Sequence, residues 1–300
     1  MRIAIIGMGE VGCTLYEALM EGGLKIDYVA DKKPSQRAID LCRDGNSTLT
    51  TDAQTCLGNL DLILSCVEGE TAAFIATLVA EHGHAGQVLV DFSTASADTK
   101  RQAAASLATC DIQYIDIAIM GAIALTGSKT SMIAAGIEPG SASDSAIAKL
   151  TQAGLMIKII ANSQPGDAIS LKLLRSIFTK GMEALTTECL SAAEHLGVRQ
   201  ALYEVLSDVD QTHLPDFLEM LVSTHVVHAA RRKKEVERAH DQLQDLGLDS
   251  LMMPAVCAVF ERTERLHDRN TTLSPPSPET ALAILTRLGQ HSHSKKALKT

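Results

Sequence analysis

The chain of 300 residues has no tryptophan, and aromatic residues make up only 3% of it. Its core must be built from aliphatic residues and methionine, which suits α/β layers and helix bundles better than a β-sandwich. No apolar stretch approaches the roughly twenty residues that span a bilayer. The net charge of −9 provides no basic face for nucleic acid and no polybasic membrane anchor. We therefore expect a small-molecule partner, with no nucleic acid and no membrane.

Seven cysteines are present, but none forms a C-x-x-C pair, and their number is odd. This pattern predicts free, buried thiols in a reducing compartment rather than a disulfide framework. A strand-like run at residues 2–6 leads directly into glycines, so no signal peptide is predicted. Together these observations predict a cytoplasmic protein.

Residues 1–162 alternate β-rich runs with helical patterns. The strand-like runs cover residues 2–6, 25–30, 60–65, 87–92, 112–117, 130–134 and 156–160. Helix-length segments lie between them, at residues 10–21, 34–43, 70–82, 96–107 and 141–152. This alternation predicts parallel βαβ units, and thus an α/β fold with a Rossmann-type doubly wound parallel sheet.

The pattern changes after residue 162, where no further strand is predicted. Apolar residues at helical spacing cover residues 168–196, followed by Gly197 as a C-cap, and further helices are predicted at 199–207, 215–221, 222–246 and 251–268. We expect an all-α domain for substrate binding and dimerisation at residues 163–268. A partly flexible tail with one helix at 279–288 is predicted for residues 269–300.

The strongest motif is a glycine-rich loop between the first strand and the first helix. Its first glycine suits a tight turn, its second lets the backbone approach a pyrophosphate, and its third lets the helix pack close to the sheet. The phosphates would lie at the helix N-terminus, where free N–H groups favour anions. The motif therefore predicts dinucleotide binding at Gly7, Met8, Gly9, Glu10, Val11 and Gly12.

Asp31 closes the next predicted strand, where an acidic side chain accepts hydrogen bonds from the adenosine ribose. A carboxylate in this place favours NAD, because it would repel the 2′-phosphate of NADP. Lys32, Lys33 and Arg37 follow directly, and they suit either a 2′-phosphate or a solvated helix start. We expect NAD as the cofactor, with Lys32 beside it, and NADP stays open.

Two further blocks lie at predicted strand ends: Asp91-Phe92-Ser93-Thr94 and residues 116–122, which end in Met120-Gly121-Ala122. With the glycine loop, they resemble the β-hydroxyacid dehydrogenases, the family of 3-hydroxyisobutyrate and 6-phosphogluconate dehydrogenases, over about residues 1–260. The resemblance implies Thr94 beside the nicotinamide ribose and Met120, Gly121 and Ala122 beside the substrate. The family usually has Ser-Gly-Gly at this last position, and the absence of the serine here implies a substrate carboxylate bound differently, or a bulkier or less polar substrate.

Lys172 lies at the predicted domain junction among apolar residues. Partial desolvation there would lower the pKa of its amine, so that it could exchange a proton near neutral pH, although a lone lysine is commonly a surface residue. The resemblance implies that Lys172 is the catalytic acid/base. Ser176 stands where the family has asparagine, and Arg175, Ser176 and Lys180 resemble substrate contacts of a branch with a divergent 6-phosphogluconate-dehydrogenase-like C-terminal domain.

Two weaker cofactor contacts are expected. Lys234 resembles a family lysine that reaches the cofactor from the second domain, but the alternative is a solvated helix face with an Arg231–Glu235 ion pair. Cys66 and Val67 follow a strand end at the cofactor cleft, and Cys66 is expected to pack against the dinucleotide rather than act as a nucleophile.

His225 and His228 are three residues apart on a predicted helix, a spacing that can bind a metal ion. No third ligand joins them at an obvious spacing, so we predict packing or a dimer contact and no metal site.

The sequence thus predicts an NAD(P)-dependent dehydrogenase that transfers a hydride between nicotinamide and the CH–OH group of a small β-hydroxy acid or sugar acid. Two alternatives stay open: C=N reduction, as in the imine reductases that share this architecture, and a non-catalytic dinucleotide-sensing protein. The resemblance also implies a homodimer.

Overall fold

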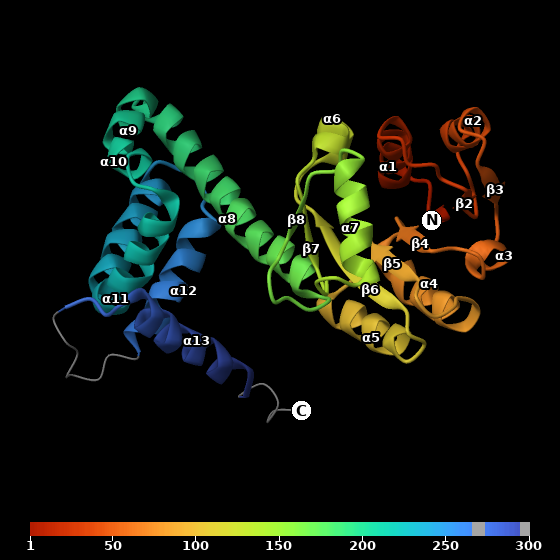
Figure 1. Cartoon of the computed structure of the whole chain (residues 1–300). Coiled ribbons are helices and arrows are strands. Elements are labelled where there is room, and N and C mark those ends of the chain that lie inside the picture. Colours follow the sequence, from red (N-terminus) through yellow and green to blue (C-terminus); the bar gives the residue numbers. More distant parts are fainter. Residues whose placement is uncertain (266–273, 295–300) are drawn as a thin grey trace. The chain divides into compact units, whose positions relative to one another are not determined.

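The computed structural model describes residues 1–265 and 274–294. The chain divides into two compact units, Met1–Ile177 and Phe178–Thr300 (Figure 1). The division falls within the long helix α8 (Asp167–His195). The first turns of this helix, including Lys172, therefore belong to the same unit as the glycine loop.

The first unit is built on an eight-stranded sheet in the order β3-β2-β1-β4-β5-β6-β7-β8. All neighbouring strands pair in parallel except β6 and β7, so the predicted Rossmann-type α/β fold is confirmed. The strands are β1 (Ile3–Ile6), β2 (Tyr28–Ala30), β3 (Thr48–Thr50), β4 (Leu62–Ser65), β5 (Val88–Asp91), β6 (Gln113–Ile119), β7 (Met132–Ala135) and β8 (Ile157–Ile159).

Strand β7 is the one departure from parallel pairing among the strands of this sheet. A parallel return needs a crossover over one face of the sheet, usually through a helix. Here only the short helix α6 (Ile123–Thr126) and the 3-10 turn η1 (Gly127–Lys129) lie between β6 and β7, and both pack against α1 (Glu10–Glu21). The chain therefore reverses at the carboxyl end of β6 and returns beside it.

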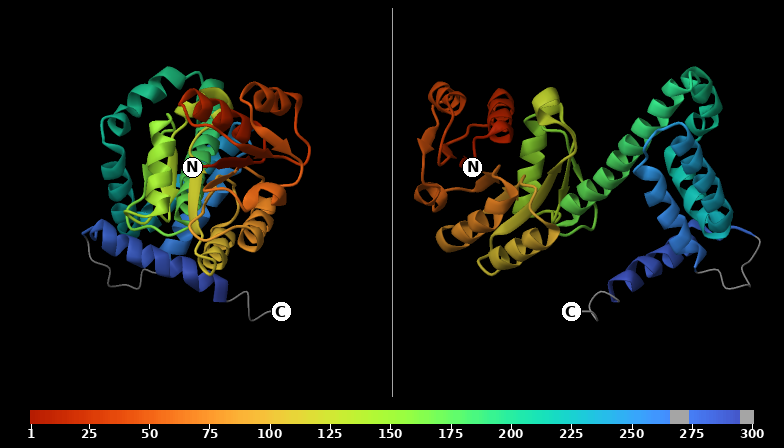
Figure 2. Two further views of the ribbon diagram at one scale, coloured as in Figure 1. Left: turned by 45° about the vertical axis from the view of Figure 1, so that its right-hand side comes forward. Right: turned by 180° about the vertical axis from the view of Figure 1, so that it is seen from behind.

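Helices cover both faces of the sheet (Figures 1 and 2). On one face, Ile3 and Ile5 belong to a core cluster that includes residues of α1, α2 (Gln36–Asp44) and α7 (Ala142–Gln152). On the other face, Ala4 and Ile6 belong to a cluster with α3 (Gln54–Leu57), α4 (Gly69–His82) and α5 (Ala97–Ala108). Burial on both faces explains the nearly continuous apolar runs of the central strands.

The short strand β3 was missed in the sequence because its three residues are a polar edge segment rather than an apolar run. The five helices predicted before residue 160 are all present, with limits that differ by two residues or fewer from those expected. Ser35, Ser96 and Ser141 cap three of them, because each hydroxyl accepts a backbone N–H of the first turn.

The second unit contains the later part of α8 followed by α9 (Arg199–Val205), α10 (Ser207–Asp210), α11 (Leu214–Asp245), α12 (Met252–Glu264) and α13 (Pro278–Ser294). Within its described residues no strand occurs. The helices predicted at 215–221 and 222–246 are one continuous helix, α11, because no glycine or proline separates them. Residues 266–268 of the helix predicted at 251–268 lie outside the described residues.

Part of the tail that was predicted to be partly flexible is helical. Helix α13 is longer than the segment expected at 279–288, packs against α11 and α12, and buries Ala281 completely. Residues 269–273 and 295–300 of the tail lie outside the described residues.

Two sets of local hydrogen bonds stabilise helix ends in the second unit. Gly197 follows α8 with a φ of +70°, and Val198 N–H donates to the Ala193 carbonyl at 2.9 Å, which confirms the predicted glycine C-cap. The Glu188 carboxylate accepts backbone N–H groups of Leu251 and Met252, at 2.9 and 3.1 Å, at the start of α12.

Across residues 1–265 and 274–294, no helix has the length and apolarity that a bilayer crossing requires.

Replacing Ile5 by alanine in the central strand β1 tests the two-sided burial of the sheet. Ile5 is 0% exposed, so Ile5→Ala should lower the free energy of unfolding by about 2–5 kcal/mol, measured by urea denaturation. The matched control is Ile159→Ala in the edge strand β8, where the side chain is 43% exposed and a loss below about 1 kcal/mol is expected. Equal losses in the two variants would contradict this description of the core.

Candidate functional site

The glycine loop joins the end of β1 to the start of α1. Gly7 has a φ of +92°, a conformation that side chains rarely adopt, and its N–H donates to the Ala30 carbonyl at 2.8 Å. A Cβ on Gly12 would lie 2.0 Å from the carbonyl oxygen of Gly7. Only glycine at this position lets α1 pack so close to the strand, as the motif predicted.

Gly9 is the N-cap of α1, and no atom lies within 4 Å of the position its Cβ would take. The helix begins with Glu10 and Val11, and the first N–H groups of a helix have no partner within it. This arrangement of open space before unpaired donors fits a pyrophosphate group. The side chain of Met8 lies in the core instead, at 2% exposure.

Asp31 lies directly after β2 and connects it to the glycine loop. One carboxylate oxygen accepts Met8 N–H at 2.7 Å, and the other accepts Lys33 N–H at 2.8 Å. Each oxygen has a second acceptor position for a ribose hydroxyl. The neighbouring cations have their own partners: the Arg37 guanidinium pairs with Glu17 at 2.7 Å, and the Lys32 ammonium lies 5.1 Å from the centre of the Phe74 ring.

A cavity of about 700 Å³ opens at the carboxyl ends of β1, β2 and β4. It brings together Gly7, Gly9, Asp31, Lys32, Cys66 and Val67, all of them predicted cofactor residues. Phe74, Thr71 and Gln54 also line it, and sequence analysis did not identify them. Phe74 is an exposed aromatic residue on α4, and only the fold shows that this helix faces the glycine loop.

The loop after β5 is ordered by the buried carboxylate of Asp91. This group accepts Ser93 N–H at 2.8 Å, the Ser93 hydroxyl at 3.1 Å and the Tyr114 hydroxyl. Burial and the Asp91 charge both raise the pKa of Tyr114, so its phenol remains a donor. Thr94 is exposed, and its backbone lies beside Gly69 at the start of α4, where a Cβ on Gly69 would approach it to 3.1 Å.

Asp116 on β6 holds the beginning of α8. One of its carboxylate oxygens accepts Gly166 N–H at 3.0 Å and Ile169 N–H at 3.1 Å. The other accepts the ammonium of Lys100 at 2.7 Å. Lys100 is 0% exposed, and its ammonium also lies 3.2 Å from the Asp91 carbonyl oxygen and 3.5 Å from the Asp91 carboxylate.

Lys172 is half-buried on α8, one turn after the residues that Asp116 holds. Partial burial and the positive charge of Lys100 lower the pKa of Lys172 below its ordinary value. The Ser176 hydroxyl donates to the Lys172 carbonyl at 2.9 Å, which places Ser176 and Lys172 on one face of the helix. Arg175 is exposed on the same helix.

The predicted substrate loop follows the carboxyl end of β6. Met120 N–H donates to the Ser131 carbonyl at 2.9 Å, and its side chain packs against a small cluster that contains Ala118 and Ala168. Because Ala168 is one turn before Lys172, this cluster places Met120 next to the helix that carries the lysine. Gly121 and Ala122 are exposed.

Lys234 belongs to the second unit, where it is exposed on α11. The Arg231–Glu235 ion pair expected on the same helix is present. A cofactor contact of Lys234 stays a prediction.

The remaining motifs have structural partners. His225 forms a hydrogen bond with the Thr263 hydroxyl at 2.8 Å, and its ring packs against that of Phe260 with centres 4.8 Å apart and planes tilted by 44°. Among residues 1–265 and 274–294, no group of three or more His, Cys, Asp or Glu side chains is placed to hold a metal ion.

All seven cysteines are free thiols, and burial raises the pKa of Cys66, which keeps this thiol neutral.

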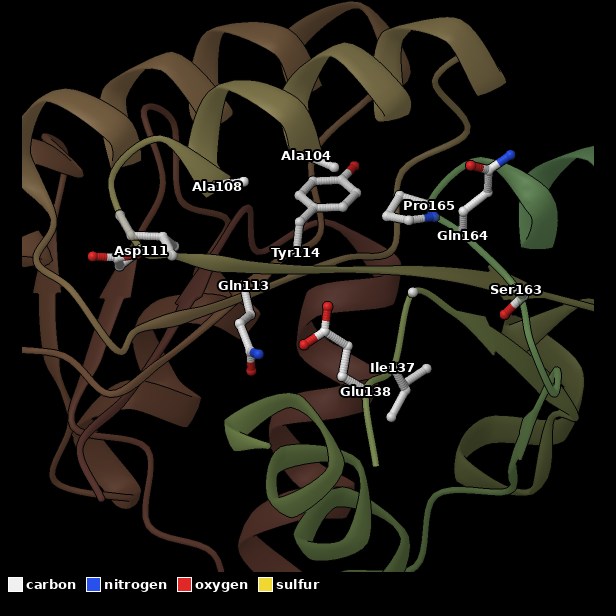
Figure 3. A pocket seen from close by; sticks show the side chains of 12 residues that line it. Ala104, Ala108, Asp111, Gln113, Tyr114, Ile137, Glu138, Ser163, Gln164 and Pro165 are labelled. Atoms are coloured by element: carbon white, nitrogen blue, oxygen red, sulfur yellow. The ribbon is translucent and has the colours of Figure 1, made fainter. Parts of the chain in front are cut away.

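A second cavity, of about 500 Å³, lies at the opposite edge of the sheet (Figure 3). Gln113 at the start of β6 and Gly136 after the antiparallel β7 both line it, which places it at the amino ends of the parallel strands. It contains no predicted site residue. Its wall includes Tyr114, whose hydroxyl reaches Asp91.

Comparison with known proteins shows the family. Residues 2–160 match the model described as the NAD binding domain of 6-phosphogluconate dehydrogenase, and residues 193–263 match a domain of unknown function (DUF1932). The chain belongs to the 6-phosphogluconate dehydrogenase NAD-binding family. This result confirms the resemblance to the β-hydroxyacid dehydrogenases and identifies the chain as an NAD(P)-binding oxidoreductase of that family.

Similar proteins extend over most of the chain. An uncharacterized 28.5 kDa protein of Methanothermus fervidus is 25% identical over 88% of this chain and 99% of its own. A solved protein of unknown function, described as similar in structure to 3-hydroxyacid dehydrogenases, is 28% identical with a TM-score of 0.60, covering 88% of this chain and 97% of its own.

An imine reductase from Aspergillus terreus, solved in complex with NADPH4, has a TM-score of 0.72 at 15% identity. The match covers 89% of this chain and 96% of that enzyme, and it shows a shared fold.

Two glycines of the family motif provide a matched test of the loop. Gly12→Ala should lower both stability and cofactor affinity, because the new Cβ would meet the Gly7 carbonyl and displace α1. Gly9→Ala should leave thermal stability unchanged, since its Cβ enters open space, and should weaken dinucleotide binding by about tenfold or more by blocking the pyrophosphate. Differential scanning calorimetry and isothermal titration measure the two effects. Retained affinity in Gly9→Ala would place the dinucleotide elsewhere.

Proposed function

We propose that this protein is a dehydrogenase that transfers a hydride between a nicotinamide cofactor and the CH–OH group of a small β-hydroxy acid or sugar acid. The observation that carries the proposal is Lys172, a half-buried lysine with a lowered pKa in the same compact unit as the glycine loop. A binding protein without turnover has no need for such a group. A bound nicotinamide would supply the hydride acceptor or donor.

Lys172 is proposed as the acid/base. In the oxidation direction its neutral amine accepts the proton of the substrate hydroxyl, and in the reduction direction its ammonium returns that proton. Lowering the pKa of an amine increases the neutral fraction at neutral pH, so partial burial and the Lys100 charge both favour the oxidation direction.

Substrate orientation is assigned to residues around Lys172. Ser176 shares its helix face, and Arg175 provides a guanidinium that can bind a carboxylate. Met120, Gly121 and Ala122 form the proposed opposite wall, with Met120 packed beside the start of α8. Met120 stands where the family has a serine hydroxyl, which makes this wall less polar. Binding of the substrate carboxylate would therefore depend more on the Arg175 guanidinium.

NAD is proposed as the preferred cofactor. The Asp31 carboxylate lies in the cavity, where it would repel a 2′-phosphate. The Arg37 guanidinium is paired with Glu17 and is therefore partly neutralised as a phosphate ligand. Lys32 and Lys33 keep NADP as the alternative, in line with the NADPH4 complex of the imine reductase.

The proposal includes two contacts from beyond the first unit. Lys234 is proposed as a cofactor ligand from the second domain, and a homodimer is proposed as the assembled form. Leu174 and Ile177 are exposed apolar residues on α8 that a second copy would cover.

Replacing Lys172 by alanine tests the proposed chemistry. A panel of β-hydroxy acids and sugar acids with NAD⁺ or NADP⁺, and of cyclic imines with the reduced cofactors, is followed by nicotinamide absorbance. We expect oxidation of a hydroxy acid by the wild-type protein and a loss of about 10²–10⁴-fold in kcat for Lys172→Ala, with cofactor affinity unchanged. The control is Lys149→Ala, an exposed lysine on α7, which should retain full activity.

The pH profile distinguishes the role of Lys172 further. The rate of substrate oxidation should increase with pH through a pKa below the ordinary value of 10.5 for lysine. The rate of reduction should decrease with pH through the same pKa. Full activity in Lys172→Ala would refute the acid/base assignment. Turnover of imines alone would favour the imine reductase, and cofactor binding without any turnover would favour a sensor.

Changing Asp31 to asparagine tests the cofactor preference. In Asp31→Asn the amide keeps an oxygen for Met8 N–H but the negative charge is lost, so the ratio of Kd for NADP⁺ to Kd for NAD⁺ should fall by about tenfold, measured by titration calorimetry. Asp40→Asn on α2 makes the same substitution at a partly exposed acid outside the cavity and should leave the ratio unchanged. A wild-type protein that already prefers NADP⁺ would show that Asp31 does not exclude the 2′-phosphate.

A further inference from the structure

The most unusual side chain of the first unit is a lysine without solvent contact. Lys100 extends from α5 into the interior and is 0% exposed, although lysine is almost never fully buried unless it is paired. Its ammonium has three N–H donors and three acceptors within reach: an Asp116 carboxylate oxygen at 2.7 Å, the Asp91 carbonyl oxygen at 3.2 Å and an Asp91 carboxylate oxygen at 3.5 Å.

The two acids that pair with Lys100 each hold a different part of the proposed site. Asp91 binds the N–H and hydroxyl of Ser93, and thereby orders the loop that leads to Thr94. Asp116 binds the N–H groups of Gly166 and Ile169, and thereby fixes the first turn of α8. Asp91 and Asp116 are also register partners on β5 and β6, so their carboxylates would repel each other without a cation between them.

We propose that Lys100 is a positioning residue whose buried ammonium ties the loop after β5, on the cofactor side, to the helix that carries Lys172. This inference rests on the proposed function, because it gives Lys172 the acid/base role. Lys100 does not touch the reacting atoms; it acts through Asp91 and Asp116.

Further contacts support this coupling. A Cβ on Gly166 would lie 2.8 Å from the Ala97 carbonyl oxygen, so the chain that enters α8 packs directly on the start of α5. Arg101, the residue after Lys100, lies 3.7 Å from the Asp167 carboxylate at the first position of α8. The loop after β5, α5 and the first turn of α8 therefore form one packed group around the Lys100 ammonium.

The charge of Lys100 reaches Lys172. It contributes, together with burial, to the lowered pKa of Lys172. The charged groups of this region include Lys100 and Arg101 on α5, Asp91 on β5, Asp116 on β6 and Asp167 on α8, and Arg175 lies further along α8. Removing one of the buried charges should shift the titration of Lys172 in a direction given by the sign of the charge removed.

Two variants with opposite expected shifts test the proposal without a known substrate. In Lys100→Met the carboxylates lose their cation, so the pKa of Lys172 should rise. In Asp116→Asn the amide oxygen still accepts the N–H groups of α8, but one negative charge beside Lys100 is lost. The positive charge of Lys100 then acts more strongly on Lys172, so the pKa of Lys172 should fall. The midpoint of the Lys172 titration is measured from the pH dependence of its acetylation by acetic anhydride, quantified by mass spectrometry. Lys149→Met is the control and should leave this midpoint unchanged.

NADH affinity provides the second readout, because the loop that carries Thr94 depends on Asp91. Lys100→Met should weaken NADH binding severalfold, measured by fluorescence titration, and Lys149→Met should not. Opposite shifts of the Lys172 midpoint with weakened NADH binding support the proposal. An unchanged midpoint in folded Asp116→Asn, or shifts of the same sign in both variants, would overturn it. If Lys100→Met does not fold, Asp116→Asn alone decides.

These measurements need no turnover, so they are independent of the substrate panel. A wild-type protein that turns over no substrate, but shows the opposite midpoint shifts, would refute the dehydrogenase and retain the coupling by Lys100. Normal turnover with unchanged midpoints would refute the coupling and retain the dehydrogenase.

Discussion

A sheet buried on both faces tolerates few polar side chains along its strands, and this constraint determines where chemistry can occur in the first unit. Along β1 and the middle of β4 and β5 the residues are aliphatic, and helices cover both sides. Polar groups are concentrated where the parallel strands end: Asp31 after β2, and Asp91 at the end of β5. The glycine loop lies at the same edge, so the proposed cofactor site is found there as a result of the layer architecture.

Asp116 is the exception, because it lies within β6 rather than at its end. A carboxylate buried at this depth is stable only when it is paired and hydrogen-bonded, and Lys100 with two N–H groups of α8 provides these partners. Removing one partner of such a buried pair typically costs about 3–5 kcal/mol, because the other charge is left uncompensated. The attachment of α8 to the sheet thus depends on a charged contact in a core that is otherwise aliphatic.

Features that depend on local backbone geometry could be predicted from the sequence. The roles of Gly7 and Gly12 follow from a tight turn and a close helix, both set within a few residues, and the structure places them as expected.

Lys100 could not be found this way, since it follows polar residues on an ordinary helix and its burial depends on Asp116, sixteen positions along the chain. The reversal of β7 was missed for a related reason: strand direction depends on how the connection packs, and periodicity does not report it. Lys172 was found through family resemblance, and its lowered pKa depends on partial burial and on the charge of Lys100, a residue that the sequence pattern did not single out.

The position of Lys172 before the division at Ile177 has a consequence for how such proteins diversify. The cofactor loop, the proposed proton-transfer group and the buried charges that hold them are encoded in one contiguous stretch of chain. The proposed substrate contacts Arg175 and Ser176 lie in the same stretch, so sequence change in the helical module that follows would leave these proposed groups unaltered. The family matches follow the same division: residues 2–160 match a named NAD-binding family, and residues 193–263 match a domain of unknown function.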